Sequence, residues 1–114
     1  MATNNKNCTR FYSSAQEQYL AKLLGAECTP NSGAGHWKKG DLLLPDWLIE
    51  AKTCVKPKSS FSIKKDWIEK NELERLEMHK PYCALAFQFE PDGENYFVLS
   101  EKTFKKFLDI LKQE

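Results

Sequence analysis

Two short apolar runs separated by a turn constrain the fold of this chain more than any other feature of its sequence. Residues 40–52 read GDLLLPDWLIEAK, in which Pro45-Asp46 has the composition of a turn. Apolar runs of this length, bounded by turn residues, are typical of buried β-strands. We therefore predict two neighbouring strands, over residues 38–44 and 47–54, that pair antiparallel through a tight connection.

Charged residues stand at the outer ends of these two predicted strands. Asp41 begins the first strand, and Glu50 and Lys52 lie toward the end of the second. Side chains alternate between the two faces of a strand, so Glu50 and Lys52 point to one face while Ala51 points back into the core. Antiparallel pairing is then expected to bring the carboxylate of Asp41 close to that of Glu50.

Two carboxylates and an ammonium in one small volume suit the hydrolysis of a phosphodiester. Magnesium takes oxygen ligands, and one or two carboxylates together with substrate phosphate are sufficient to hold it. A lysine beside the ion can stabilise the negative charge that develops during attack on phosphorus. The alternative for Glu50 and Lys52 is a surface ion pair, because the pattern E-x-K is common by chance.

A helix is predicted ahead of these strands, over residues 13–25 with the sequence SSAQEQYLAKLLG. Ser14 and Glu17 have the spacing of a capping box, leucines form an apolar stripe, and Gly25 ends the helix. Glu17 either completes this cap or faces the predicted metal pocket.

The order of these features resembles the PD-(D/E)XK nuclease superfamily, and within it the small Holliday junction resolvases of archaeal and phage type. The resemblance covers roughly residues 13 to 88 and rests on Glu17, Asn31-Ser32-Gly33-Ala34-Gly35, Gly40-Asp41 and Ile49-Glu50-Ala51-Lys52-Thr53. The usual Pro-Asp of the family is Gly-Asp here. Pro45-Asp46 lies only four residues before Glu50, too close for the two-strand arrangement.

This resemblance implies an α/β fold of the restriction-endonuclease type, with a mixed central sheet flanked by helices. It implies an endonuclease that uses magnesium, or manganese in its place, and acts as a homodimer on branched DNA in recombination and repair. The implied catalytic residues are Glu17, Asp41, Glu50 and Lys52, and the implied metal ligands are Glu17, Asp41, Glu50 and Ala51. Two alternatives remain: a nuclease of flaps, ends or other DNA structures, and a catalytically idle DNA-binding module.

Basic residues gather around the predicted site, although the whole chain has a net charge of only +1. Residues 36–65 include seven lysines and three acidic residues. Such a cluster is what a phosphate-binding rim requires, and a solvated lysine-rich loop is the alternative. The predicted DNA contacts are Gly33, His36, Lys38, Lys39, Lys56, Lys58, Lys64 and Lys65, and the resemblance implies Ser32 as a further contact.

The 114 residues are predicted to form a single nuclease domain, with residues 1–10 as a flexible N-terminus. The predicted order is helix, three strands, helix, two strands, helix. The second helix covers residues 63–79, with Trp67, Ile68, Leu73 and Leu76 on its inner side, and the last one covers residues 103–112.

The cysteines and the hydropathy of the chain exclude other classes of protein. Its four cysteines are widely separated and show no zinc-ligand spacing, so we expect reduced thiols, with Cys54 and Cys83 in the core. No signal segment and no apolar stretch of membrane-spanning length occurs in the sequence, and we therefore expect a cytoplasmic protein.

Overall fold

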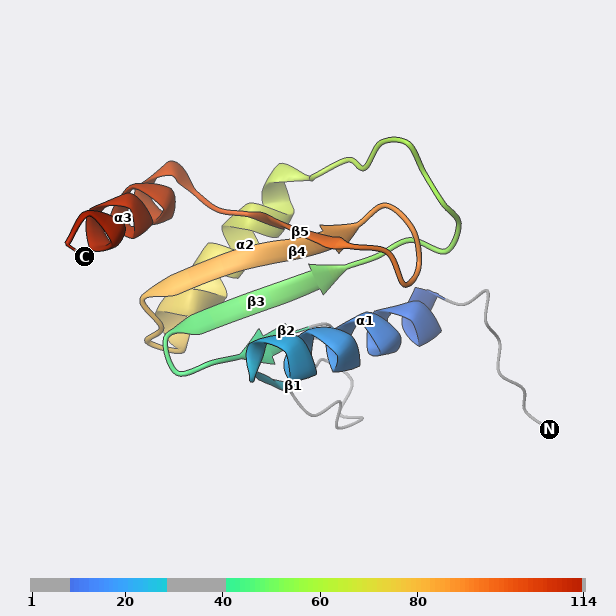
Figure 1. Cartoon of the computed structure of the whole chain (residues 1–114), viewed down its shortest axis with the longest axis horizontal. Coiled ribbons are helices and arrows are strands. Elements are labelled where there is room, and N and C mark those ends of the chain that lie inside the picture. Colours follow the sequence, from blue (N-terminus) through green and yellow to red (C-terminus); the bar gives the residue numbers. More distant parts are fainter. Residues whose placement is uncertain (1–8, 29–40, 114) are drawn as a thin grey trace.

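The computed structural model describes residues 9–28 and 41–113, with side chains from residue 14 onward. A mixed five-stranded sheet lies between helix α1 on one face and helix α2 on the other, and helix α3 stands at one end of the sheet (Figure 1). The elements are α1 (Thr9–Leu24), β1 (Glu27–Cys28), β2 (Asp41–Leu43), β3 (Trp47–Lys52), α2 (Lys65–Glu77), β4 (Tyr82–Gln88), β5 (Asn95–Val98) and α3 (Glu101–Lys112). The predicted α/β class and the predicted order of elements are confirmed.

The strands are arranged in their sequence order, β1-β2-β3-β4-β5. Neighbouring strands pair antiparallel except for β3 and β4, which are parallel. A parallel pair needs a long connection that crosses the face of the sheet, and α2 lies within that connection. The predicted antiparallel pairing of β2 with β3 is confirmed, and its register places Asp41 opposite Glu50.

The two faces of the sheet differ in chemistry because side chains alternate along β3. Ile49 and Ala51 belong to the apolar core on the α1 side, as predicted for Ala51. Glu50 and Lys52 have the opposite parity and point to the α2 side. The core cluster on the α1 side consists of Leu20, Leu42, Ile49, Ala51, Ala84 and Ala86.

Helix α1 begins at Thr9, so the predicted capping box at Ser14 is wrong, because Ser14 lies inside the helix. The predicted end is confirmed: Gly25 has a φ of +72°, a left-handed conformation that glycine adopts without steric cost. Thr9 and Arg10 are helical, and the rest of the predicted flexible N-terminus lies outside the described residues.

Helix α2 faces the sheet with Trp67, as predicted, but with polar side chains in place of the predicted leucines. Leu73 and Leu76 are 56% and 57% exposed, whereas Asn71 and Glu74 are buried. Asn71 and Glu74 lie four and seven residues after Trp67, so these three side chains form one stripe of the helix. The assumption that leucines mark the inner face was wrong, because this face packs against the side of the sheet that carries Glu50 and Lys52.

Helix α3 has the clearest local signals of the three helices. The Ser100 hydroxyl accepts a hydrogen bond from the backbone N–H of Thr103 at 3.1 Å, which caps the first turn. Among the helices of the described residues, none combines the length and the apolar character needed to cross a bilayer.

Candidate functional site

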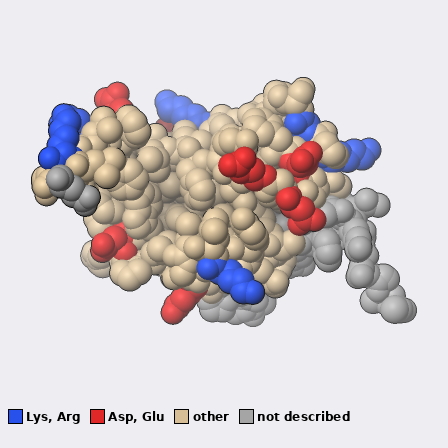
Figure 2. Space-filling view, in the orientation of Figure 1, with Lys and Arg blue, Asp and Glu red and all other residues tan. Residues whose placement is uncertain are grey.

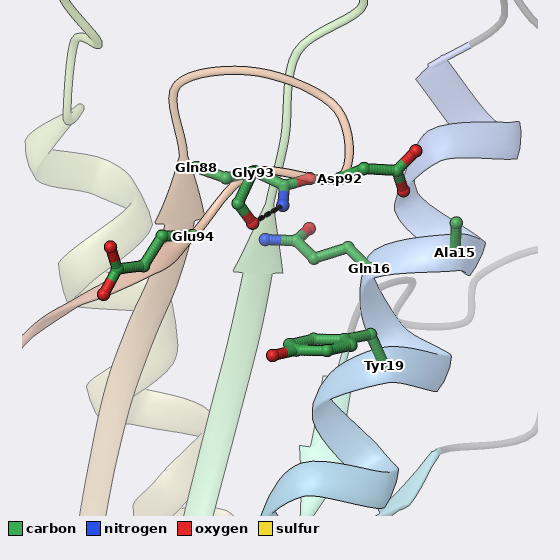
Figure 3. Close-up of a pocket in the computed structure, with 7 residues that line it drawn as sticks. All are labelled: Ala15, Gln16, Tyr19, Gln88, Asp92, Gly93 and Glu94. Carbon is green, nitrogen blue, oxygen red and sulfur yellow. Dashed lines mark hydrogen bonds between the residues drawn. The ribbon is translucent and has the colours of Figure 1, made fainter.

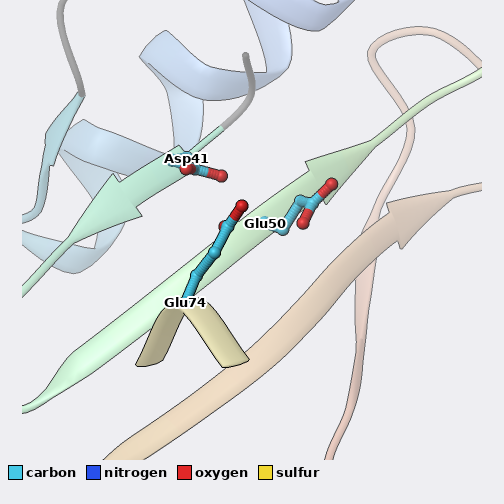
Figure 4. Close-up of side chains that lie close together, drawn as sticks. All are labelled: Asp41, Glu50 and Glu74. Atoms are coloured by element: carbon cyan, nitrogen blue, oxygen red, sulfur yellow. The ribbon is translucent and has the colours of Figure 1, made fainter. Parts of the chain in front are cut away.

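Three buried carboxylates from three different elements come together on the α2 side of the sheet (Figure 4). Asp41 of β2, Glu50 of β3 and Glu74 of α2 are 1%, 7% and 6% exposed. One carboxylate oxygen of each residue lies within 4.8 Å of the other two. The β2–β3 register sets Asp41 opposite Glu50, and the inner stripe of α2 adds Glu74.

This arrangement of carboxylates is energetically unfavourable unless something compensates it. Burying an ionised carboxylate costs several kcal/mol, and acids this close repel each other when both are charged. A shared proton or a bound cation removes most of that repulsion. Three clustered oxygen donors without sulfur or imidazole match the preference of magnesium and manganese, so the donor set fits the expected metal.

The Lys52 side chain lies beside this cluster and is held from two directions. Its Nζ is 2.9 Å from the Glu50 carboxylate and 4.3 Å from the ring centroid of Trp67. Phe61 packs on Trp67 with ring centroids 6.4 Å apart and on Phe87 with centroids 5.1 Å apart. Because the Glu50 side chain is only 9% exposed, this ion pair is not the solvent-exposed pair considered as the alternative.

The end of β3 that carries Lys52 is tied to α1 by Gln16. The Gln16 side-chain N–H donates to the backbone carbonyl of Lys52 and to the side-chain oxygen of Asn95, both at 2.9 Å. Sequence reasoning missed this residue, although its position four residues before Leu20 on the inner face of α1 was a usable signal. Gln16 thereby fixes the strand end that presents Lys52.

A polar pocket of about 450 Å³ lies next to Gln16 on the α1 side of the sheet (Figure 3). Figure 2, which looks onto this side, shows acidic side chains gathered near the β4–β5 turn. The exposed acids of this turn are Glu90, Asp92 and Glu94. Their charge disfavours a phosphate here. The residues that line the pocket are Ala15, Gln16, Tyr19, Gln88, Asp92, Gly93 and Glu94.

The structure does not bring Glu17 into the carboxylate cluster. Glu17 belongs to α1, which covers the opposite face of the sheet from Glu74. Its backbone carbonyl accepts a hydrogen bond from the Cys28 thiol at 3.8 Å. Burial, and then the nearby charge of Glu17, raise the pKa of Cys28. Among the described residues, the third acid of the cluster is therefore Glu74.

Glu74 is the functional candidate that sequence reasoning missed. The signal was present but faint: Trp67, Asn71 and Glu74 share a helical stripe, and a tryptophan on that stripe indicates the buried face. The Nδ2 atom of Asn71 is buried without a hydrogen-bond partner among the described residues. A buried stripe with two polar members is unusual for a helix that only packs.

No family model matches this chain. No curated protein and no solved structure matches it either.

The remaining predicted site residues divide into three groups. The side chain of Ala51 is in the core, and the proposed role of this residue as a metal ligand stays a prediction. Exposed lysines follow the end of β3, at positions 56 and 58 in the connection to α2 and at 64 and 65 where α2 begins. The predicted DNA contacts Ser32, Gly33, His36, Lys38 and Lys39 lie outside the described residues.

The thiols of the described residues are free, and two of them are in the core as predicted. Cys54 and Cys83 are buried, and Cys28 is exposed. Burial, followed by the neighbouring charge of Glu72, raises the pKa of Cys83 to about 12. Cys83 therefore stays a neutral thiol at physiological pH and packs as a small apolar group.

Proposed function

We propose that this protein is a metal-dependent DNA endonuclease that hydrolyses phosphodiester bonds in branched DNA, most specifically a Holliday junction resolvase of phage type. The proposal depends on one observation, the buried cluster of Asp41, Glu50 and Glu74 with Lys52 beside it. The mixed sheet flanked by helices is compatible with the restriction-endonuclease fold that the sequence resembles.

The burial of the cluster supports a catalytic role over a structural one. An ion pair or acid cluster on the surface has little effect on stability and needs no explanation. Buried acids oppose folding, and apolar residues of similar volume would stabilise the same positions better. A chain that keeps three of them on one face of its sheet therefore gains something other than stability, and a cation site supplies that gain.

Asp41, Glu50 and Glu74 would hold the cation, because these residues supply the clustered oxygen atoms. When bound, magnesium or manganese supplies Lewis-acid chemistry to a phosphate group and its attacking water. The carboxylates fix the charge and position of the site before DNA arrives, since they are carried by paired strands and a packed helix.

Lys52 would act on the phosphate that is being cleaved. Its ammonium lies at the edge of the cluster, where it can stabilise the extra negative charge on the phosphate oxygens in the transition state. The ring of Trp67 restricts the lysine side chain and attracts its charge. Gln16 holds the backbone of the same residue, so both ends of Lys52 are positioned.

The distribution of charge indicates the side from which DNA approaches. Exposed lysines at 56, 58, 64 and 65 follow the end of β3 that carries Lys52. The β4–β5 turn on the α1 side carries exposed acids, which repel phosphates. We therefore expect the duplex to contact the connection between β3 and α2 rather than the β4–β5 turn.

Cleavage assays with defined DNA substrates test the proposal. A labelled four-way junction is compared with matched linear duplex, flap and single-stranded DNA, in the presence of magnesium, manganese or a chelator. We expect metal-dependent paired nicks, placed symmetrically and confined to the junction.

The outcomes separate the alternatives. Cutting of flaps or ends would favour the alternative function, a nuclease that acts on other DNA structures, over the resolvase. If none of the substrates is cut in a metal-dependent way, the proposed endonuclease activity is refuted. The variant Glu50→Gln is the control for contaminating nucleases, since any activity that survives in it comes from another protein.

A further inference from the structure

Five aromatic side chains form a continuous group beside the candidate site. Neighbouring rings of this group have their centroids between 5.1 and 6.4 Å apart. Phe87 lies opposite both Lys52 of β3 and Tyr96 of β5, so the group is on the α2 side of the sheet. We call it the aromatic strip, and it consists of Phe61, Trp67, Phe87, Phe89 and Tyr96.

None of the five side chains of the aromatic strip is fully buried. Four of them are half-buried, and Tyr96 is 44% exposed. The apolar core cluster, by contrast, is built from leucine, isoleucine and alanine on the other side of the sheet. Single exposed apolar side chains are ordinary, but a contiguous group of partly exposed rings indicates a binding surface.

Lysine side chains lie over the rings at one end of the aromatic strip. The Nζ atoms of Lys52 and Lys64 are 4.3 and 5.8 Å from the ring centroid of Trp67. The Nζ atom of Lys58 is 5.8 Å from the ring centroid of Phe61. Lysine is depleted in the interfaces between proteins. Rings interleaved with cations are instead typical of sites for single-stranded nucleic acid, where bases stack on the rings and the cations follow the phosphates.

The aromatic strip begins at the carboxylate cluster. Lys52 belongs to both, since its Nζ is 2.9 Å from the Glu50 carboxylate and also lies over Trp67. At the other end of the strip, the Tyr96 hydroxyl is 3.5 Å from the Glu94 carboxylate. Phosphates therefore favour the end with the lysines, which is the end next to the candidate site.

We propose that the aromatic strip binds the bases of a short unpaired DNA segment by stacking, while Lys58 and Lys64 contact the phosphates of that segment. A fully paired duplex keeps its bases inside the stack, whereas bases that are already unpaired are the easiest to extrude onto a protein surface. The inference rests on the proposed endonuclease for its ligand, DNA. It adds that the preferred branched substrate carries unpaired nucleotides beside the phosphate that is cleaved.

Binding of single strands with and without bases tests the proposal. Fluorescence anisotropy is measured without metal, with a labelled oligothymidylate of about ten nucleotides and with an abasic phosphodiester chain of the same length. The two chains carry the same charge, so the contribution of the phosphates is the same in both. We expect wild type to bind the oligothymidylate at least about tenfold more tightly than the abasic chain, because stacking on aromatic rings strengthens binding to this extent.

Variants locate the base-dependent part of the binding. Phe61 and Tyr96 are tested because Lys52 already covers the ring of Trp67. Phe61→Leu and Tyr96→Leu remove a ring but keep an apolar side chain, and each should weaken oligothymidylate binding about fivefold or more without changing the affinity for the abasic chain. Phe97→Leu is the matched control, because Phe97 is 41% exposed on the same strand and points to the α1 side. Circular dichroism confirms that the variants are folded.

Each result bears on the aromatic strip or on the enzyme separately. Equal affinity of wild type for the two chains overturns the proposed stacking. Base-dependent binding that survives in both Phe61→Leu and Tyr96→Leu, or that Phe97→Leu weakens equally, overturns the assignment to the strip. Base-dependent binding without cleavage of any substrate supports the strip and refutes only the proposed enzyme, whereas cleavage without base-dependent binding refutes only the strip.

Discussion

The two faces of the central sheet alternate residue by residue along β3, and only one of them carries buried charges. On the α1 side, Ile49 and Ala51 of β3 pack into an apolar core. On the α2 side, Glu50 and Lys52 of the same strand meet the carboxylates of Asp41 and Glu74. Both faces bury apolar side chains, including Leu48 and Leu85 on the α2 side, but only the α2 face also buries carboxylates, which oppose folding.

This difference separates the source of stability from the candidate site. Apolar burial contributes about 25 cal/mol per Å², whereas each buried carboxylate opposes folding by several kcal/mol unless it is compensated. The α1 face therefore stabilises the scaffold, and the α2 face holds the groups that can do chemistry. Substitutions on the α1 face should change the free energy of unfolding, whereas substitutions in the carboxylate cluster on the α2 face should change the rate of cleavage.

The largest effect is expected from Asp41→Asn and Glu50→Gln. Each should reduce junction cleavage roughly 10³-fold or more, because the site loses a charge that holds the cation. The melting temperature of Asp41→Asn without metal should stay level or rise, since the repulsion within the cluster is reduced. Glu50→Gln should melt at a lower temperature, because it leaves Lys52 without its carboxylate partner. Glu90→Gln, at an exposed acid of the β4–β5 turn, is the control and should cleave normally. Near wild-type cutting by Asp41→Asn would remove the cluster from the mechanism.

Leu42→Ala tests the other face at the next residue of β2. Leu42 is fully buried in the core cluster, so we expect a loss of about 3 kcal/mol in the free energy of unfolding. Urea denaturation measures this loss. Cleavage per folded molecule should remain close to wild type, and a loss of activity larger than the loss of folded protein would contradict the separation of the two faces.

Lys52→Ala should slow cleavage about 10²-fold with little change in metal affinity, because the ammonium acts on charge that develops in the transition state. Single-turnover cleavage and manganese titration measure the two quantities separately. Trp67→Leu should give a smaller loss, since it removes only the ring that positions the lysine. Unchanged turnover in Lys52→Ala would reduce this residue to an ion-pair partner of Glu50.

Glu74→Gln tests whether the third acid of the cluster is Glu74, as the structure indicates, or Glu17, as the sequence predicted. We expect manganese affinity to fall about tenfold, as loss of a carboxylate near a metal typically produces. Calorimetric titration measures it. Glu77→Gln, at an exposed position one turn further along α2, is the matched control. If Glu17→Gln rather than Glu74→Gln weakens metal binding, the third acid comes from α1 after all.

The smallest effect is expected at the exposed lysines in the connection between β3 and α2. Replacing Lys56 and Lys58 by alanine should lower the slope of log affinity against log salt by up to about 1.8, if each lysine neutralises one phosphate. DNA binding is measured with a four-way junction in buffer without magnesium, over a series of salt concentrations. Lys112→Ala at the far end of α3 should leave the slope unchanged. An unchanged slope in the double variant would place DNA elsewhere on the surface.

Much of the fold could be predicted because the signals are local. Apolar runs and turn residues located β2 and β3, and the alternation of side chains correctly assigned Glu50 and Ala51 to opposite faces. Gly25 marked the end of α1. Each of these features depends on a few neighbouring residues, so the sequence alone was sufficient.

The predictions that were wrong concern features for which tertiary packing outweighs the local sequence pattern. The Ser14 capping pattern was overridden because the chain before it is already helical. Leucines at 73 and 76 indicated an inner face for α2, but the helix turns Asn71 and Glu74 toward the sheet instead. Local spacing defines the stripes of a helix and does not say which stripe the rest of the protein will cover.

The sequence by itself determined the two neighbouring strands and the approach of Asp41 to Glu50, because a period of two residues and a tight turn leave little choice. Tertiary structure alone decided that Glu74 completes the cluster and that Glu17 does not. The reason is geometric: the β3–β4 crossover places α2 on the charged face of the sheet and α1 lies on the other face, and no local interaction specifies that placement.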